Sequence, residues 1–238
     1  MLGLMGCSAT VGNANEDAAV ATPTAADAAV TSEGSAESPL DDESEPTGGA
    51  EAPGESEAER ADIVLPLALY VVTETDNPDS PLNSARTAAE LEEIAVNVGD
   101  IWSQAGVVFE VVTVGEVSMP RSVLEPIVTE RDTRPFFAEV GQSFAVEQPG
   151  VINGFYVRGA GGANGFAPLT SRVFFVMDEP SVHDERVSSH EIGHILGLRH
   201  DLGDAGRLMF SGTNGMELTD QEQEVARYGA EGLIVTNR

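Results

Sequence analysis

Residues 190–200 combine three histidines and a glutamate at spacings that suit a metal site, in the order His-Glu-Ile-Gly-His-Ile-Leu-Gly-Leu-Arg-His. On a helix, His190 and His194 lie four residues apart on one face, so both imidazoles can bind one cation. Gly197 can adopt the left-handed conformation that ends a helix and turns the chain, which would bring His200 back as a third ligand. Three protein ligands leave one position of a tetrahedral zinc ion open, as in catalytic zinc sites.

Glu191 follows the first histidine and is therefore expected to face a water on the zinc rather than the zinc itself. A carboxylate in that place can act as a general base. The pattern His-Glu-x-x-His alone is common, but the five fixed positions together are expected by chance on the order of 10⁻⁴ times in such a chain. Three of the four histidines of the chain fall in this segment, and the fourth, His183, is expected on the surface or at the helix entry.

The pattern of residues 190–200 resembles the extended zinc motif of the metzincins, a clan of zinc endopeptidases. The second mark of that clan is a methionine in a tight turn beneath the metal. Met209 lies nine residues after His200, a separation similar to that in matrixin-like catalytic domains, and Met216 is the weaker alternative. The resemblance implies one catalytic Zn²⁺ held by the three histidines, with Glu191 as the catalytic base.

The metzincin resemblance also implies an antiparallel edge strand that holds the substrate as an added strand through main-chain hydrogen bonds. Residues 164–168, Asn-Gly-Phe-Ala-Pro, are similar to a matrixin edge strand, so Gly165, Phe166 and Ala167 are the expected substrate-binding positions. The chain departs from the clan at Ser211, where some members have a tyrosine two residues after the methionine. It also lacks the matrixin cysteine switch.

The elements that must position these residues can be read from the apolar pattern. We expect a buried strand at 63–72 with a bulge or an edge position at Pro66, a helix at 84–105 and a strand at 107–114, joined as a parallel crossover. The proline-containing stretch 115–150 is expected to form loops with one short helix.

The carboxyl-terminal half repeats this alternation of strands and helices. Strands are expected at 151–158 and 172–178, with a short edge strand at 166–169 between them. A helix at 184–198 carries the histidines, and a capping box predicts a last helix from about 219 to 228. The predicted fold class is α/β: a twisted, mostly parallel sheet with an antiparallel edge strand, a backing helix and an active-site helix.

The charge of the chain restricts its partners. It has 40 acidic residues against 12 basic ones, all of them arginine, and a formal net charge of −28. Nucleic-acid binding requires a basic face, so nucleic acid is excluded as a partner, and electrostatic binding to anionic lipid is disfavoured. A protein or peptide substrate remains the expected partner, and the oligomeric state is left open.

The amino-terminal region differs from the rest of the chain. Residues 1–7 resemble the end of a bacterial lipoprotein signal, with Cys7 as the lipidated residue, although the apolar stretch is short and no basic residue precedes it. Either the start lies upstream of Met1 or the match is accidental. Residues 8–60 contain thirteen acidic residues, one base and no aromatic residue, which predicts disorder.

These observations predict three parts: residues 1–7 as a signal remnant, 8–61 as a disordered acidic tether, and 62–238 as the catalytic domain. An inert leader or an inhibitory propeptide is the alternative role for the tether. The expected location is extracytoplasmic, either in a bacterial cell envelope or secreted, with membrane contact only through a lipid at Cys7. Two other functions stay open, namely a binding lipoprotein without activity and a zinc hydrolase acting on other amides or esters.

Overall fold

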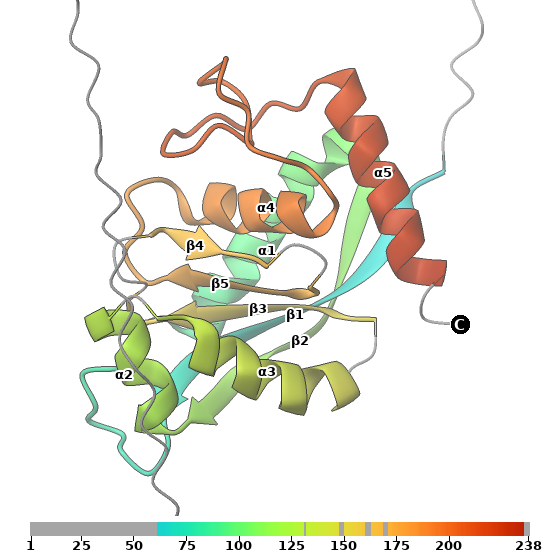
Figure 1. Cartoon of the computed structure of the whole chain (residues 1–238). Helices are drawn as coiled ribbons and strands as arrows, with labels where there is room; N and C mark the ends of the chain where they lie inside the picture. Colours follow the sequence, from blue (N-terminus) through green and yellow to red (C-terminus); the bar gives the residue numbers. More distant parts are fainter. Residues whose placement is uncertain (1–60, 131, 148–149, 160–162, 169–170, 236–238) are drawn as a thin grey trace, which may run out of the picture. The chain divides into compact units, whose positions relative to one another are not determined.

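Strand β1, Ile63–Glu74, is the first element of the described fold. The computed structural model describes residues 61–130, 132–147, 150–159, 163–168 and 171–235 (Figure 1). The expected lipidation site at Cys7 and the expected tether therefore lie outside the described residues. β1 pairs in parallel with β2, Val107–Met119, on one side and with β3, Ile152–Val157, on the other.

The sheet contains five strands in the order β2-β1-β3-β5-β4. β5, Val173–Met177, is parallel to β3, whereas β4, Gly165–Phe166, is antiparallel to β5 and forms the other edge. The predicted α/β class, with a mostly parallel sheet and an antiparallel edge strand, is confirmed. β4 is shorter than the edge strand predicted at 166–169, and Leu169 lies outside the described residues.

Pro66 has a visible effect on β1. The register between β1 and β2 shifts between Leu67 and Ala68, directly after the proline, and pairing with β3 begins only at Leu67. Because proline has no amide hydrogen, it is tolerated where a strand lacks a neighbour or bulges. The predicted bulge is confirmed, and the proline itself precedes the part of β1 that is covered on both sides.

Helix α1, Ala88–Trp102, begins later than the residue 84 predicted from the pattern. Its capping box between Thr87 and Glu90 is present, and Gly106 ends the following turn, Ser103–Ala105, with a φ of 59°. Ser84 and Ala85, which precede the helix, are bound by a side chain from another part of the fold. Asp178 accepts from the Ser84 hydroxyl at 2.6 Å and from the Ala85 amide at 2.7 Å.

The expectation of loops between 115 and 150 is wrong. β2 continues to Met119, and two helices follow, α2 (Arg121–Glu130) and α3 (Arg134–Glu147). Two of the prolines that suggested loops stand next to helix starts, at positions 120 and 135, where a missing amide hydrogen costs little. Pro126 does lie inside α2, whose Val123, Leu124 and Ile127 are buried. Burial of that apolar face stabilises the helix despite the proline.

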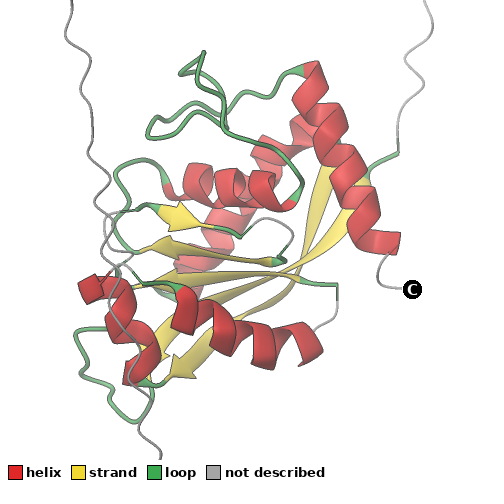
Figure 2. Cartoon of the chain, in the orientation of Figure 1, coloured by secondary structure: helices red, strands yellow, loops and turns green. Residues whose placement is uncertain are grey.

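Helices cover both faces of the sheet (Figures 1 and 2). One apolar core lies between the sheet and the helices α1, α4 (Asp184–Ile195) and α5 (Asp220–Val235). A second core lies between the opposite face and α2 and α3, with Phe136 packed edge-on against Phe155 and Phe175. Parallel strands are stable when both faces are covered in this way. None of the helices among the described residues is long and apolar enough to span a membrane.

Candidate metal centre

Helix α4 carries the first two histidines of the motif. It lies on the sheet next to β5 and β4 (Figure 1), with His190 buried and His194 half-buried. The helix begins at Asp184, as predicted, but ends at Ile195, three residues before the predicted end. His183 is its exposed amino-terminal cap residue, which agrees with the expected position at the helix entry.

Gly197 turns the chain after α4. Its φ of 96° is in the left-handed region, as the sequence predicted. The turn is closed by hydrogen bonds from the Gly197 amide to the His194 carbonyl at 3.1 Å and from the Leu198 amide to the Gly193 carbonyl at 2.8 Å. This closed turn brings the exposed His200 back against the helix.

The three imidazoles converge. His190, His194 and His200 each offer a nitrogen, and these atoms all lie within 4.8 Å of one another. The Nε2 atoms of His194 and His200 are 3.1 Å apart. Two ligands of a tetrahedral zinc ion at ~2.0–2.1 Å are separated by about 3.3 Å, so this spacing suits a shared metal ion.

Backbone carbonyls orient two of the rings. Nδ1 of His190 lies 2.8 Å from the Leu208 carbonyl oxygen, and Nδ1 of His194 lies 3.0 Å from that of Leu198. A carbonyl can only accept, so each Nδ1 carries the proton and each Nε2 presents a free lone pair. A cation between the rings could accept these lone pairs together with one from His200. The donor set therefore fits a divalent metal such as zinc.

Burial keeps these rings neutral. It lowers the pKa of His190 to about 4, with a smaller opposing contribution from the bond to Leu208. Burial lowers the pKa of His194 as well, again against its bond to Leu198. Neutral imidazole is the form that binds a metal, so both rings are ready as ligands at neutral pH.

Glu191 lies beside the histidines with 6% of its surface exposed. Burial raises the pKa of its carboxyl group to about 8, while Arg186 and a backbone hydrogen bond from Ala167 act in the opposite direction. A cation at the histidines would further favour the carboxylate. The group therefore has the environment of a residue that can both take up and release a proton near neutral pH.

The edge strand β4 lies directly against Glu191. A Cβ atom on Gly165 would stand 2.8 Å from Val187 and 3.0 Å from Cγ of Glu191, so only glycine permits this approach. The Met177 amide donates to the Asn164 carbonyl at 3.0 Å. Because peptide groups alternate in direction along a strand, those of Gly165 face the outer side. The structure thus brings the predicted edge residues Gly165 and Ala167 next to Glu191. Phe166, on the opposite face, lies against Phe137, with ring centroids 5.5 Å apart and the rings tilted by 58°.

Met209 lies beneath the histidines in a loop that we call the Met209 loop, residues 201–217. The side chain is fully buried, and its sulfur would be 2.6 Å from a Cβ atom on Gly193, between the two helical histidines. The Asp201 amide donates to the Met209 carbonyl at 3.0 Å and closes the loop. Met216, the weaker candidate, is only partly buried and packs at the margin of the core.

Sequence reasoning missed Arg186. This side chain is 3% exposed and donates to carbonyls of the Met209 loop. The available signal was its position four residues before His190, which places both on one face of α4. Ser211, which occupies the place of a tyrosine in some metzincins, is exposed.

No protein-family model matches the chain, and no curated protein matches it. Two of the solved structures that are similar to it each have 16% identity and a TM-score of 0.48. One is the structure of a chaperone-substrate complex and the other is that of archaemetzincin from Methanopyrus kandleri.

The extent of these matches differs. The first covers 74% of this chain and 35% of the other, so this chain spans about a third of that structure's length. The archaemetzincin match covers 70% of this chain and 96% of the other. At a TM-score of 0.48, neither likeness carries an argument about what this chain does. Its own geometry gives an α/β fold with three histidines that could hold a metal ion.

Proposed function

We propose that this chain is a zinc-dependent endopeptidase of the metzincin type. The observation that carries the proposal is the convergence of His190, His194 and His200 beside the buried carboxyl group of Glu191. Three nitrogen ligands leave room for a fourth ligand, which distinguishes a catalytic zinc site from a closed structural one. The narrower placement among the matrixins stays a prediction from the sequence.

The three histidines would hold the metal, and Leu208 and Leu198 orient two of their rings. Bound there, Zn²⁺ would lower the pKa of a water toward ~7 and polarise the scissile carbonyl. Glu191 takes the proton of the attacking water as general base and delivers it to the leaving amine as general acid. Its raised pKa of about 8 suits the second of these roles, and the positive field of a bound cation suits the first.

The substrate class follows from the position of β4. An extended peptide can pair with the outward peptide groups of Gly165, and this places its backbone next to Glu191. Main-chain pairing of this kind selects extended segments rather than a particular side chain. The proposed substrate is therefore an extended segment of a protein, and a nucleic acid is not expected at a chain of net charge −28.

The expected location is part of this proposal and rests on the sequence alone. A lipid on Cys7 would hold the domain at a cell-envelope membrane, and residues 8–61 would separate the two. Secretion without a lipid anchor is the other location compatible with an extracytoplasmic peptidase.

Metal analysis combined with a digest of a peptide library tests the proposed function. The purified chain should contain one zinc per molecule, lose peptide cleavage in a chelator and regain it with added Zn²⁺. A folded protein with less than about a tenth of an equivalent of zinc would contradict the metal site. Zinc binding without cleavage would favour the inactive binding protein, and cleavage of esters or small amides alone would favour a different hydrolase.

A further inference from the structure

Arg186 is a buried cation to which the proposed chemistry assigns no step, although its charge lowers the pKa of Glu191. It lies on α4, one turn before His190, and only 3% of its surface is exposed. A charged group is rarely buried unless its donors are satisfied, because the loss of hydration is costly. Among the described residues no carboxylate forms an ion pair with it. Its hydrogen-bond acceptors are backbone carbonyls instead.

All three acceptors of Arg186 are backbone carbonyls of the Met209 loop. Nη2 donates to the carbonyl of Leu208 at 2.8 Å and to that of Phe210, and Nε donates to that of Gly215 at 3.4 Å. The planar guanidinium group can point several N–H donors in fixed directions, so one side chain can tie two separate parts of a loop to one helix.

The Leu208 carbonyl is shared with a proposed metal ligand. It accepts from Nη2 of Arg186 and from Nδ1 of His190, each at 2.8 Å. A carbonyl oxygen has two lone pairs and can serve both donors. The next residue, Met209, packs beneath Gly193. The position of this carbonyl therefore determines how the His190 ring is held.

We propose that Arg186 is a positioning residue for the metal centre: by fixing the Leu208 carbonyl, it holds His190 so that Nε2 faces His194 and His200. The inference rests on the proposed zinc site but concerns metal affinity rather than catalysis. Partners that orient a metal-bound histidine commonly change metal affinity by ~10–100-fold when they are removed. Arg186 acts through Leu208 and touches neither the metal nor the substrate.

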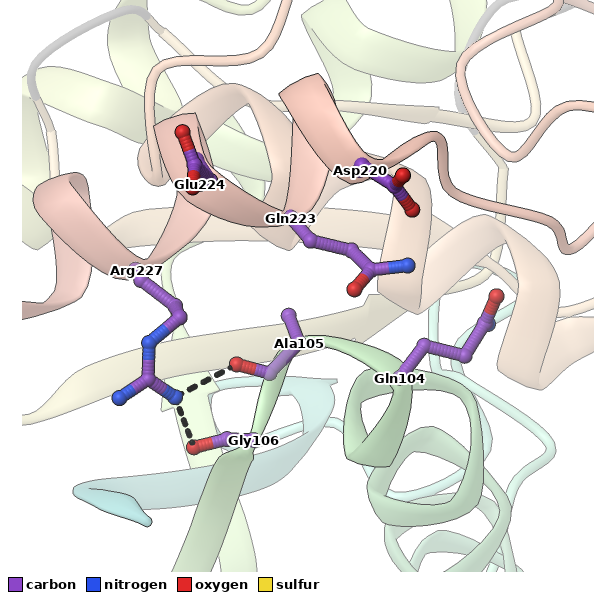
Figure 3. A pocket seen from close by; sticks show the side chains of 7 residues that line it. All are labelled: Gln104, Ala105, Gly106, Asp220, Gln223, Glu224 and Arg227. Atoms are coloured by element: carbon purple, nitrogen blue, oxygen red, sulfur yellow. Dashed lines mark hydrogen bonds between the residues drawn. The ribbon is translucent and has the colours of Figure 1, made fainter. Parts of the chain in front are cut away.

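Arg227 provides a matched control, because in the described part of the chain it also donates only to backbone carbonyls. Nη1 lies 2.8 Å from the Ala105 carbonyl and 3.2 Å from that of Gly106 (Figure 3), and Nη2 lies 2.9 Å from that of Ala61. None of these acceptors belongs to α4 or to the Met209 loop. Replacing Arg227 removes a carbonyl clamp of the same chemistry without changing the surroundings of His190.

The test measures Zn²⁺ affinity by competition with a chromogenic chelator, on the full chain and on Arg186→Met and Arg227→Met. Arg186→Met should raise the zinc Kd by about tenfold or more. Arg227→Met should leave the Kd within about twofold of wild type, even if both variants melt at a lower temperature. The visible spectrum of the Co²⁺-loaded proteins should change for Arg186→Met alone, because the geometry of one ligand changes.

An Arg186→Lys variant keeps the charge but cannot reach all three carbonyls, so it should give an intermediate Kd. It also carries the test if Arg186→Met does not fold. A zinc Kd unchanged in the folded Arg186 variants would overturn this inference and leave the proposed function standing. A wild-type chain that binds no zinc would overturn the proposed function, and this inference with it.

Discussion

The carboxyl group of Glu191 is buried beside three imidazoles and receives a backbone hydrogen bond from Ala167, the residue directly after the edge strand β4. A base that is not a ligand can be removed without loss of the metal. Glu191→Ala should therefore keep its zinc and lose cleavage by at least about 100-fold. Since a buried carboxyl group is costly to hold, the variant should melt at the wild-type temperature or above.

His200→Ala is the matched comparison, because it removes a proposed ligand and should lose both zinc and cleavage. Metal content, melting temperature and peptide cleavage are measured on all three proteins. Retention of most of the wild-type rate by Glu191→Ala would show that another group acts as the base.

Met209 and Gly193 form a second residue-scale test, since the methionine sulfur occupies the space where a side chain at 193 would begin. Met209→Ala should cost about 2–5 kcal/mol of unfolding free energy because it leaves a cavity. Gly193→Ala should also destabilise the fold, because its Cβ would collide with the methionine. In the double variant the new methyl group fills part of the cavity.

The two losses should therefore fall short of additivity by on the order of 1 kcal/mol in urea unfolding of the metal-free proteins. Strict additivity would show that the side chain of Met209 does not interact with position 193 of α4. A Met209→Ala protein that melts like wild type but lacks activity would assign the methionine a chemical role instead of a packing one.

Among the secondary-structure elements, β4 makes the most specific prediction. Gly165→Ala places a methyl group against Val187, the Phe175 carbonyl and Glu191, all at 3.0 Å or less. The strand must then move away from α4, so cleavage should fall by about tenfold or more while the zinc content stays constant. Gly99→Ala in α1 meets no atom within 4 Å and serves as the control. Equal rates for the two variants would contradict a role for β4 in holding the substrate.

The helix that carries the site could be predicted because its information is local. His190, His194, Gly197 and His200 are placed by helical spacing and by one left-handed glycine, and neither depends on distant contacts. The strands around it could be predicted for a similar reason, since buried parallel strands appear as continuous apolar runs. The apolar pattern placed the start of α1 too early, whereas the capping box of Thr87 and Glu90 marks the start that the structure shows.

The parts that sequence reasoning missed depend on tertiary structure. Helices α2 and α3 contain or adjoin prolines, and their stability comes from apolar faces packed on the far side of the sheet. Arg186 looks like an ordinary polar helix residue until the Met209 loop supplies three carbonyls from 22 to 29 residues away. Local sequence patterns do not show where a loop that follows many residues later will pack.

At the scale of the whole molecule, the amino-terminal region gives a prediction that rests on the sequence. The carbonyl of Ala61 accepts from Arg227, so the fold already holds the chain at that point. A protein that begins at Ala61 should melt at the same temperature as the full chain and cleave peptides at the same rate. Faster cleavage by the shortened protein would identify the preceding region as an inhibitory propeptide. The lipid anchor at Cys7 stays a prediction, and detergent partitioning of the protein and of Cys7→Ser tests it.

The long outer edge of β2 has a consequence for how copies of this protein behave in solution. Among the described residues nothing pairs with that edge, and Val108, Val111 and Val112 are between 40% and 46% exposed along it. The unpaired backbone groups of such an edge can form hydrogen bonds with a strand of a second molecule. Repulsion between molecules of net charge −28 opposes this contact at low ionic strength. At about 1 M salt the repulsion extends only ~3 Å, so light scattering should reveal reversible self-association there and dispersed monomers at about 0.01 M.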